Sequence, residues 1–152
     1  MSGPKIIVRW VLLLLIIVST ACTTPRTNPV GYFEIPVIDL NRAIRFYYSV
    51  FGFAFTRETI DGNQMALLPL HEGARGISGA LAQGKTYVPS TTGTLVYFDT
   101  ENIDASLSKA ITAGGKILYP KTSIGPSGFV AEFQDSEGNR VGLHQRKQKI
   151  SP

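Results

Sequence analysis

The chain has 152 residues, of which 43% are hydrophobic and 17% are charged. This composition is typical of one globular domain and excludes a disordered protein. The net charge of +4 comes from the two ends of the chain. Between Val30 and Gln145, nine basic residues stand against eleven acidic ones, a formal charge of −2. The domain therefore has no basic stripe, and we expect no nucleic acid as a partner.

The first thirty residues have the features of an export signal. Lys5 and Arg9 precede an apolar run over residues 10–18, which is too short to span a bilayer comfortably. Small residues follow up to Cys22, the only cysteine, so no disulfide can form within the chain. An ordinary signal peptide, or an uncleaved anchor with an incidental cysteine, would account for the same pattern.

The stretch Ser19-Thr-Ala-Cys22 resembles the lipobox of bacterial lipoproteins, although Ser19 stands where leucine is usual. The resemblance implies a signal peptide over residues 1–21, cleavage before Cys22 and acylation of its thiol, with palmitate among the attached chains. Residues 22–29 are polar and would form a tether. Thr23 after the cysteine implies, by the same analogy, an outer membrane location facing the periplasm in a Gram-negative host.

A strand–helix–strand pattern then occurs twice, over residues 30–55 and 93–118. In each copy an alternating segment ends at a short polar residue, Asp39 or Asn102, that suits a helix N-cap. Apolar residues follow at helical spacing. Glycine closes both helices, at Gly52 and at Gly114 with its neighbour. The repeat predicts two similar modules whose inner faces enclose a site.

Past each helix the sequence predicts β-hairpins separated by turn residues. The expected strands cover residues 53–59, 64–70 and 77–83 in the first copy, and 116–119, 129–134 and 140–145 in the second. Each module is therefore βαβββ. We expect a single domain over residues 30–146, made of modules 30–84 and 93–146, with a linker over 85–92 and a tail over 147–152.

Two segments resemble the vicinal oxygen chelate superfamily, which includes glyoxalase I, bleomycin-resistance proteins and extradiol dioxygenases. They are Glu34-Ile-Pro-Val-x-Asp-Leu-x-Arg-Ala-Ile-x-Phe-Tyr47 with Val50-Phe-Gly-Phe53, and Asp135-Ser-Glu-Gly-Asn-Arg-Val-Gly-Leu-His144. The resemblance covers almost all of residues 30–145. It implies an α+β fold in which two βαβββ modules form a cleft between curved sheets, with helices packed on the outer faces.

The same resemblance implies four metal-ligand positions, one on the first and one on the last strand of each module. Counting from Asp39, Asn102 and the turn glycine gives Tyr32, Leu95 and Gly142, and the fourth position falls near Gly79. None of these residue types suits Zn²⁺, Fe²⁺ or Mn²⁺. We therefore expect a domain without the family metal and without another cofactor.

Strand alternation predicts which side chains line the cleft. We expect Tyr32 and Glu34 on the first strand, Tyr97 on the fifth, and Arg140 and His144 on the last to face the ligand. The apolar neighbours on each strand fall on the opposite face, which supports this register.

Each of these residues also has a structural interpretation. Glu34 can simply pair with a neighbouring Arg, Tyr or His, and Arg140 can brace Glu132 or Asp135. His144 can be an exposed residue at a strand end, and the tyrosines can be wall residues.

Two functions remain. The first is a binding module that holds a small organic molecule in the cleft of a membrane-anchored lipoprotein. The alternative is a lyase, isomerase or dioxygenase that uses an atypical metal site or Glu34 as a general base. Catalytic residues are not identified, and pairing of the chain into a homodimer is left open.

Overall fold

The computed structural model describes residues 30–147, which form two βαβββ modules in succession. The elements of the first module are β1 (Phe33–Pro36), α1 (Leu40–Phe51), β2 (Thr56–Ile60), β3 (Asn63–Leu67) and β4 (Gly79–Gln83). Those of the second are β5 (Tyr97–Asp99), α2 (Ile103–Thr112), β6 (Lys116–Ser123), the 3₁₀ turn η1 (Gly125–Ser127), β7 (Phe129–Gln134) and β8 (Arg140–Gln145). The predicted α+β fold with two such modules is confirmed.

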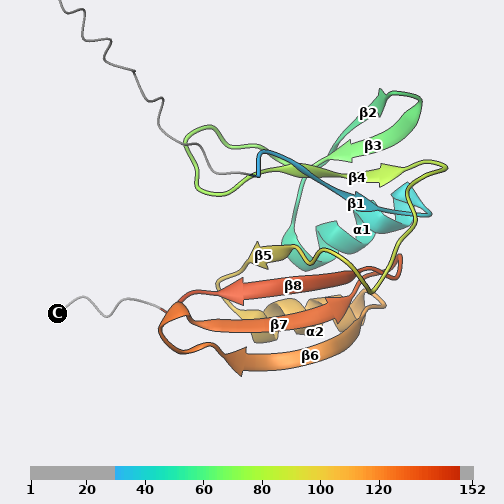
Figure 1. The fold of residues 1–152 in the computed structure, drawn as a ribbon. Coiled ribbons are helices and arrows are strands. Elements are labelled where there is room, and N and C mark those ends of the chain that lie inside the picture. Colours follow the sequence, from blue (N-terminus) through green and yellow to red (C-terminus); the bar gives the residue numbers. More distant parts are fainter. Residues whose placement is uncertain (1–29, 148–152) are drawn as a thin grey trace, which may run out of the picture.

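Each module contributes one four-stranded sheet, with orders β1-β4-β3-β2 and β5-β8-β7-β6. The first strand of each module pairs in parallel with the last strand, and the other pairs are antiparallel. The edge strands β1 and β5 are where the two sheets lie side by side, and β2 and β6 are the edge strands farthest from each other (Figure 1). This arrangement creates a seam between the modules along β1 and β5.

The helices begin where the sequence predicts. The Asp39 side chain accepts a hydrogen bond from the backbone N–H of Arg42, and the Asn102 side chain accepts one from Ala105. Helix α1 ends at Gly52, whose φ of 76° is in the left-handed region that favours glycine. These caps set the direction in which each strand enters its helix.

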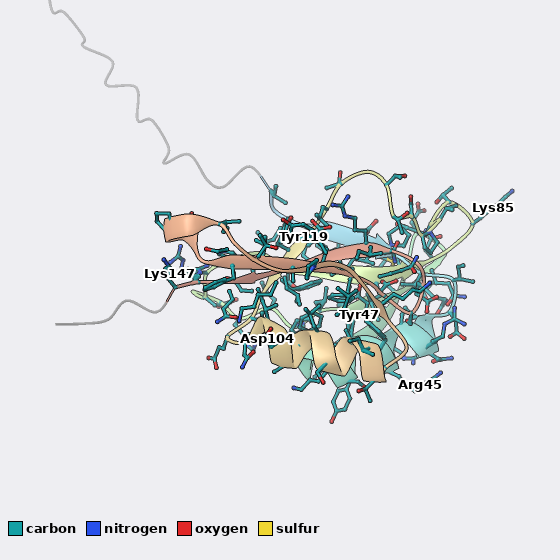
Figure 2. The ribbon with its side chains drawn as sticks, turned by 90° about the horizontal axis from the view of Figure 1, so that it is seen from below. Arg45, Tyr47, Lys85, Asp104, Tyr119 and Lys147 are labelled. Atoms are coloured by element: carbon teal, nitrogen blue, oxygen red, sulfur yellow. The ribbon has the colours of Figure 1, made fainter. Side chains whose placement is uncertain are left out.

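One core serves both modules and lies on the helix side of the sheets. Figure 2 shows both helices on one side of the strands, with Tyr47 between the helices and the strands. Phe33 of β1 and Phe98 of β5 meet edge to face across the seam, with ring centroids 6.0 Å apart. The buried strand residues of this core are Ile35, Ala66, Leu81, Ala131, Phe133, Val141 and Leu143, and Val37 joins them just after β1.

The bounds of four strands differ from the expectation. Strand β3 already ends at Leu67 and β4 begins only at Gly79, because the connection between them is longer than predicted. Strand β6 continues past Tyr119 to Ser123, although the sequence has a proline at position 120. The pairing of β6 with β7 shifts register on both sides of Tyr119, and β6 lies at the sheet edge, where a proline is tolerated. Strand β2 begins only at Thr56, because Phe53 and Phe55 pack against the core instead of forming a ladder.

The turn between β7 and β8 fastens the second module to the first. The Glu137 carboxylate is completely buried and accepts hydrogen bonds from the backbone N–H groups of Ile38 and Asp39 at 3.0 and 2.9 Å. It also forms two bonds with the Arg42 guanidinium, at 2.8 and 2.9 Å. Burial alone would raise the pKa of Glu137, but these donors outweigh it and hold the pKa below its ordinary value.

Two more residues of the same turn cross the seam. The Tyr47 hydroxyl donates to Asp135 Oδ2 at 2.8 Å. The Asn139 amide donates to the Pro36 carbonyl at 2.8 Å, and its oxygen accepts from the backbone N–H of Ser90 at 3.1 Å. The turn over residues 135–139, called the clamp turn below, thus contacts β1, α1 and the linker together.

The predicted signal peptide, Cys22 and the tether lie outside the described residues. Within residues 30–147, no helix is both long enough and apolar enough to cross a membrane.

Candidate functional site

The faces of the strands follow the predicted alternation. On β1, Ile35 is buried against the helices, whereas Glu34 is exposed on the other side. On β8, Val141 and Leu143 are buried in the core, and Arg140 lies on the opposite face. Tyr32 and Tyr97 are about half exposed. The surface away from the helices therefore carries the polar candidates.

A pocket of about 240 Å³ lies at the seam of the two modules. Glu34 and Pro36 line it from β1, and Arg140 lines it from β8. Val88, Ser90 and Thr92 of the linker, Thr94 after it and Asn139 of the clamp turn also line the pocket. The seam pocket thus brings together a carboxylate, Glu34, and a guanidinium, Arg140, from different modules.

Glu34 is bonded to a residue that the sequence did not single out. The hydroxyl of Tyr87, in the linker, donates to Glu34 Oε2 at 2.7 Å. The hydrogen bond to Glu34, with partial burial, raises the pKa of Tyr87. Burial and the charge of Glu34 also raise the pKa of Tyr32. The Glu34 carboxylate thus acts on tyrosines both just before β1 and in the linker.

Arg140 is held by a buried acid of its own sheet. Its guanidinium lies 2.6 Å from Glu132 Oε2, as the structural interpretation of the sequence anticipated. The Tyr97 hydroxyl lies 3.3 Å from the other oxygen of Glu132. The hydrogen bond with Glu132 raises the pKa of Arg140, and burial together with the charge of Glu132 raises the pKa of Tyr97. Arg140 still presents its outer edge to solvent, where a ligand can bind.

His144 lies at the other end of β8, four residues from Arg140 and therefore about 13 Å along the strand. Its Nδ1 is 3.0 Å from Asp99 Oδ1, and its Nε2 is 2.9 Å from the Ser127 carbonyl oxygen. Both partners are acceptors, so the ring donates to both only when each nitrogen carries a proton. The structure therefore does not bring His144 to the seam pocket.

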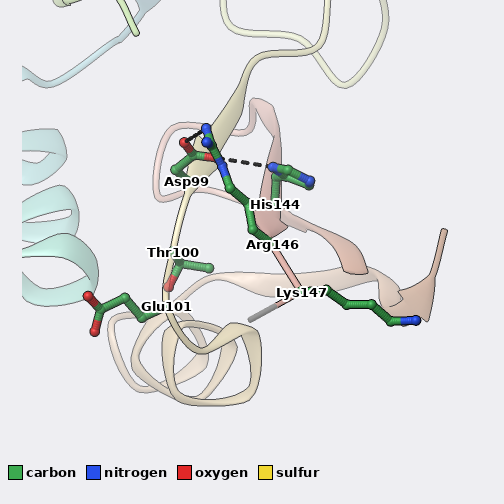
Figure 3. Close-up of a pocket in the computed structure, with 6 residues that line it drawn as sticks. All are labelled: Asp99, Thr100, Glu101, His144, Arg146 and Lys147. Atoms are coloured by element: carbon green, nitrogen blue, oxygen red, sulfur yellow. Dashed lines mark hydrogen bonds and ion pairs between the residues drawn. The ribbon is translucent and has the colours of Figure 1, made fainter. Parts of the chain in front are cut away.

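A second pocket, of about 480 Å³, surrounds this histidine. Arg146 Nη2 donates to Asp99 Oδ2 at 2.7 Å, so His144 and Arg146 converge on one carboxylate (Figure 3). Burial raises the pKa of Asp99, but the hydrogen bond from His144 and the charge of Arg146 outweigh it and lower the pKa. Glu101 and Lys147, which also line this pocket, point away from that group (Figure 3).

Two glutamines identify the equivalent positions of the modules. The side-chain oxygen of Gln83 accepts from the first backbone N–H of α1, on Leu40, at 2.8 Å. Gln145 does the same for Ile103 of α2 at 3.0 Å. Counting three residues back from each glutamine gives Ala80 and Gly142. The fourth metal-ligand position, left near Gly79 by the sequence, therefore corresponds to Ala80.

These positions do not fit a metal. Ala80 and Gly142 have no side-chain donor atom, and the Tyr97 ring covers Gly142 so closely that an added Cβ would overlap a ring carbon. Among residues 30–147, no three His, Cys, Asp or Glu side chains are grouped so that they could hold a metal ion.

A third pocket, of about 410 Å³, is mostly apolar and lies at the opposite end of the seam. Phe33, Phe53 and Phe98 line it, and His71 lies at its border on the β3–β4 connection.

The comparisons with known proteins agree with this fold. The family model of the Glyoxalase/Bleomycin resistance protein/Dioxygenase superfamily matches residues 30–143. A Mycobacterium tuberculosis protein named "Putative glyoxylase CFP32" is 26% identical over 129 residues, which are 82% of this chain and 48% of that protein. The chain thus spans about half the length of that relative. A glyoxylase-like domain-containing protein of Didymella fabae is 29% identical, over 76% of this chain and 92% of its own length.

Solved structures give the same result. A glyoxalase/bleomycin resistance/dioxygenase domain from Frankia has a TM-score of 0.63 at 18% identity, covering 80% of this chain and all of that one. TnmS3 from Streptomyces, described as an antibiotic binding protein, has a TM-score of 0.58 at 25% identity, covering 82% of this chain and all of that one. The chain belongs to the glyoxalase/bleomycin resistance protein/dioxygenase superfamily.

Proposed function

We propose that this protein binds a small organic molecule in the seam pocket, without the family metal. One observation carries the proposal: Glu34 of the first module and Arg140 of the second line the same pocket. A polar molecule that presents a donor or a positive group to Glu34, and an acceptor or a negative group to Arg140, would bridge the modules. The description of TnmS3 as an antibiotic binding protein supports a binding role in a related fold.

The charges of the pocket favour recognition of ligand polarity. Glu34 bonds Tyr87 through one oxygen only, which leaves acceptor capacity for a ligand. Arg140 uses its Nε and one Nη on Glu132, and the remaining donors can meet a ligand acceptor. The volume of about 240 Å³ is below the roughly 300–1,000 Å³ of typical ligand pockets, so the pocket would hold a very small molecule or one part of a larger one.

A ligand-dependent thermal-shift screen of the purified full-length chain, followed by calorimetry of the hits, tests the proposal. For a ligand that donates to Glu34, Glu34→Gln is expected to weaken binding by about 1.5–3 kcal/mol and to change stability little. Arg140→Lys is expected to weaken the binding of an acidic ligand, because lysine keeps the positive charge but lacks the planar set of donors of a guanidinium. Arg57→Gln, on the far strand β2, is the control. Unchanged affinity in both pocket variants would reject the seam pocket.

We also propose that the mature chain is a lipoprotein of the cell envelope. The lipobox-like stretch before Cys22 supports cleavage and acylation there, and two or three acyl chains give stable attachment. Labelling with a palmitate analogue and membrane fractionation of wild type against Cys22→Ala test this. Loss of label and release of the variant are expected. Equal membrane retention of both would instead favour an uncleaved anchor.

A further inference from the structure

The first sheet has a small second core on the face away from the helices. Met65, Ala80 and Ala82 form it, each no more than 2% exposed, and Leu67 and Tyr87 pack against it. Met65 pairs with Ala82 in the sheet, and Leu67 pairs with Ala80, so the four strand residues form one contiguous floor. The Tyr87 ring, which comes from the linker, covers this floor.

The floor has the shape and chemistry of an aromatic binding surface. The two alanines carry only methyl groups, so they leave a shallow, flat surface on β4 beside the longer side chains of β3. Glu34 is the sheet partner of Ala80, so its carboxylate stands at the border of the floor. A ring lying on the floor is therefore within reach of a strong acceptor, as the 2.7 Å bond from the Tyr87 hydroxyl demonstrates.

Few backbone hydrogen bonds hold Tyr87 over the floor. Its N–H bonds the Gly84 carbonyl at 3.2 Å, which closes a turn immediately after β4. Gly84 is necessary for this turn, because an added Cβ would overlap the Asn63 side chain and lie 3.2 Å from the Tyr87 ring. The Tyr87–Glu34 bond is itself exposed to solvent. Displacement of the ring therefore breaks one exposed side-chain bond and opens one turn, and leaves the strand ladder intact.

We propose that this floor is a binding subsite for a planar aromatic group that carries a hydrogen-bond donor, such as a phenol, and that Tyr87 is the internal occupant which such a ligand displaces. Glu34 accepts the donor of the ligand as it accepts the hydroxyl of Tyr87. Because Glu34 also lines the seam pocket, a ligand with its ring on the floor extends toward Arg140. This inference rests on the proposed binding function and names the ligand class for it.

The test replaces the side chain by its free analogue. Tyr87→Ala, in the full-length chain, uncovers the floor, and 4-methylphenol carries the same ring and hydroxyl as the removed group. We expect 4-methylphenol to raise the thermal midpoint of Tyr87→Ala in a saturable manner, and toluene to bind at least about tenfold more weakly because it has no donor for Glu34. In the double variant Tyr87→Ala with Glu34→Gln, the preference for the phenol over toluene is expected to shrink.

Tyr48→Ala is the matched control, since Tyr48 is 64% exposed on α1. It removes the same group from a site without a floor, so 4-methylphenol should not stabilise it. Absence of a saturable effect on Tyr87→Ala overturns the inference. An equal effect of toluene and 4-methylphenol overturns it as well, because the site would then be only an apolar hole. If Tyr87→Ala does not fold, refolding with each compound decides: recovery with 4-methylphenol alone supports the subsite, and any other result rejects it.

The seam-pocket proposal and the aromatic-subsite proposal can be rejected independently. Arg140 does not belong to the floor, so Arg140→Lys should leave the rescue by 4-methylphenol unchanged. If the affinities of screened ligands do not change in Glu34→Gln and Arg140→Lys while 4-methylphenol stabilises Tyr87→Ala, the seam-pocket proposal fails and the aromatic subsite stands. If ligands depend on Arg140 and the rescue fails, only the subsite is rejected.

Discussion

Removing the charge of Glu137 is expected to loosen the attachment between the modules. Glu137→Gln keeps the shape of the side chain, and its one oxygen can still accept from Ile38 and Asp39. The amide group then faces the Arg42 guanidinium, donor against donor, where the carboxylate made bonds at 2.8 and 2.9 Å. The variant therefore loses the ion pair and weakens the two backbone bonds at once.

The expected cost is about 2–4 kcal/mol. Breaking a fully buried pair costs roughly 3–5 kcal/mol. The Arg42 side chain is 47% exposed, so it can turn to water and lower that figure. Chemical denaturation of the purified protein at pH 7 measures the free energy of unfolding, and the thermal midpoint should fall by roughly 6–16 °C.

Glu72→Gln is the control, because Glu72 lies exposed in the loop between β3 and β4. A double-mutant cycle of Glu137→Gln with Arg42→Gln should give a coupling energy above about 1 kcal/mol. A loss below about 0.5 kcal/mol for Glu137→Gln, or full additivity in the cycle, would refute the role assigned to the clamp turn.

Three further outcomes are expected. First, the folded pKa of Glu137 lies below its ordinary value of 4.5, so its contribution to stability is complete above pH 4.5 and is lost as the pH falls through the folded pKa. The free energy of unfolding, measured from pH 7 to pH 3, should therefore fall less with acid in Glu137→Gln than in the wild type. Identical dependence on pH in the two proteins would contradict this. Second, Tyr47→Phe removes a fully buried hydroxyl from Asp135 and should cost about 1.5–3 kcal/mol in urea denaturation, whereas Tyr48→Phe on the exposed side of α1 should cost nothing measurable. Third, since Ala80 and Gly142 offer no donor atoms, a chelator should leave the thermal midpoint unchanged, and one-to-one metal content that survives dialysis would overturn this reasoning.

The faces of the strands could be predicted because burial imposes a period of two on each strand. Ile35 and Val37 had to meet the helices, so Glu34 had to point the other way, and the structure agrees. The partners of those side chains could not be predicted. Tyr87 meets Glu34 across 53 positions of sequence, after a turn at Gly84 that the spacing does not reveal. An aromatic residue in a Ser/Thr-rich linker was the only local signal.

The same limit applies to the clamp turn and to His144. The stretch from Asp135 to Asn139 has the composition of an ordinary hairpin turn, and its bonds to β1 and α1 span about a hundred positions. Alternation correctly placed Arg140 and His144 on one face of β8. It could not tell that the ring of His144 is held by Asp99 and Ser127, far along the strand from Glu34. Facing direction is a local property, whereas distance between side chains depends on the assembled sheets.

The two modules place equivalent connections under very different constraints. The β7–β8 turn is the clamp turn, whereas the corresponding β3–β4 connection is longer, with residues 70–77 exposed to solvent. Changes of length there leave the attachment between modules untouched. The segment between Gly73 and Gly76 is therefore a suitable insertion point for a fluorescent reporter. Because β3 and β4 carry the floor beneath Tyr87, a reporter inserted there would stand at the end of the two strands that form this floor.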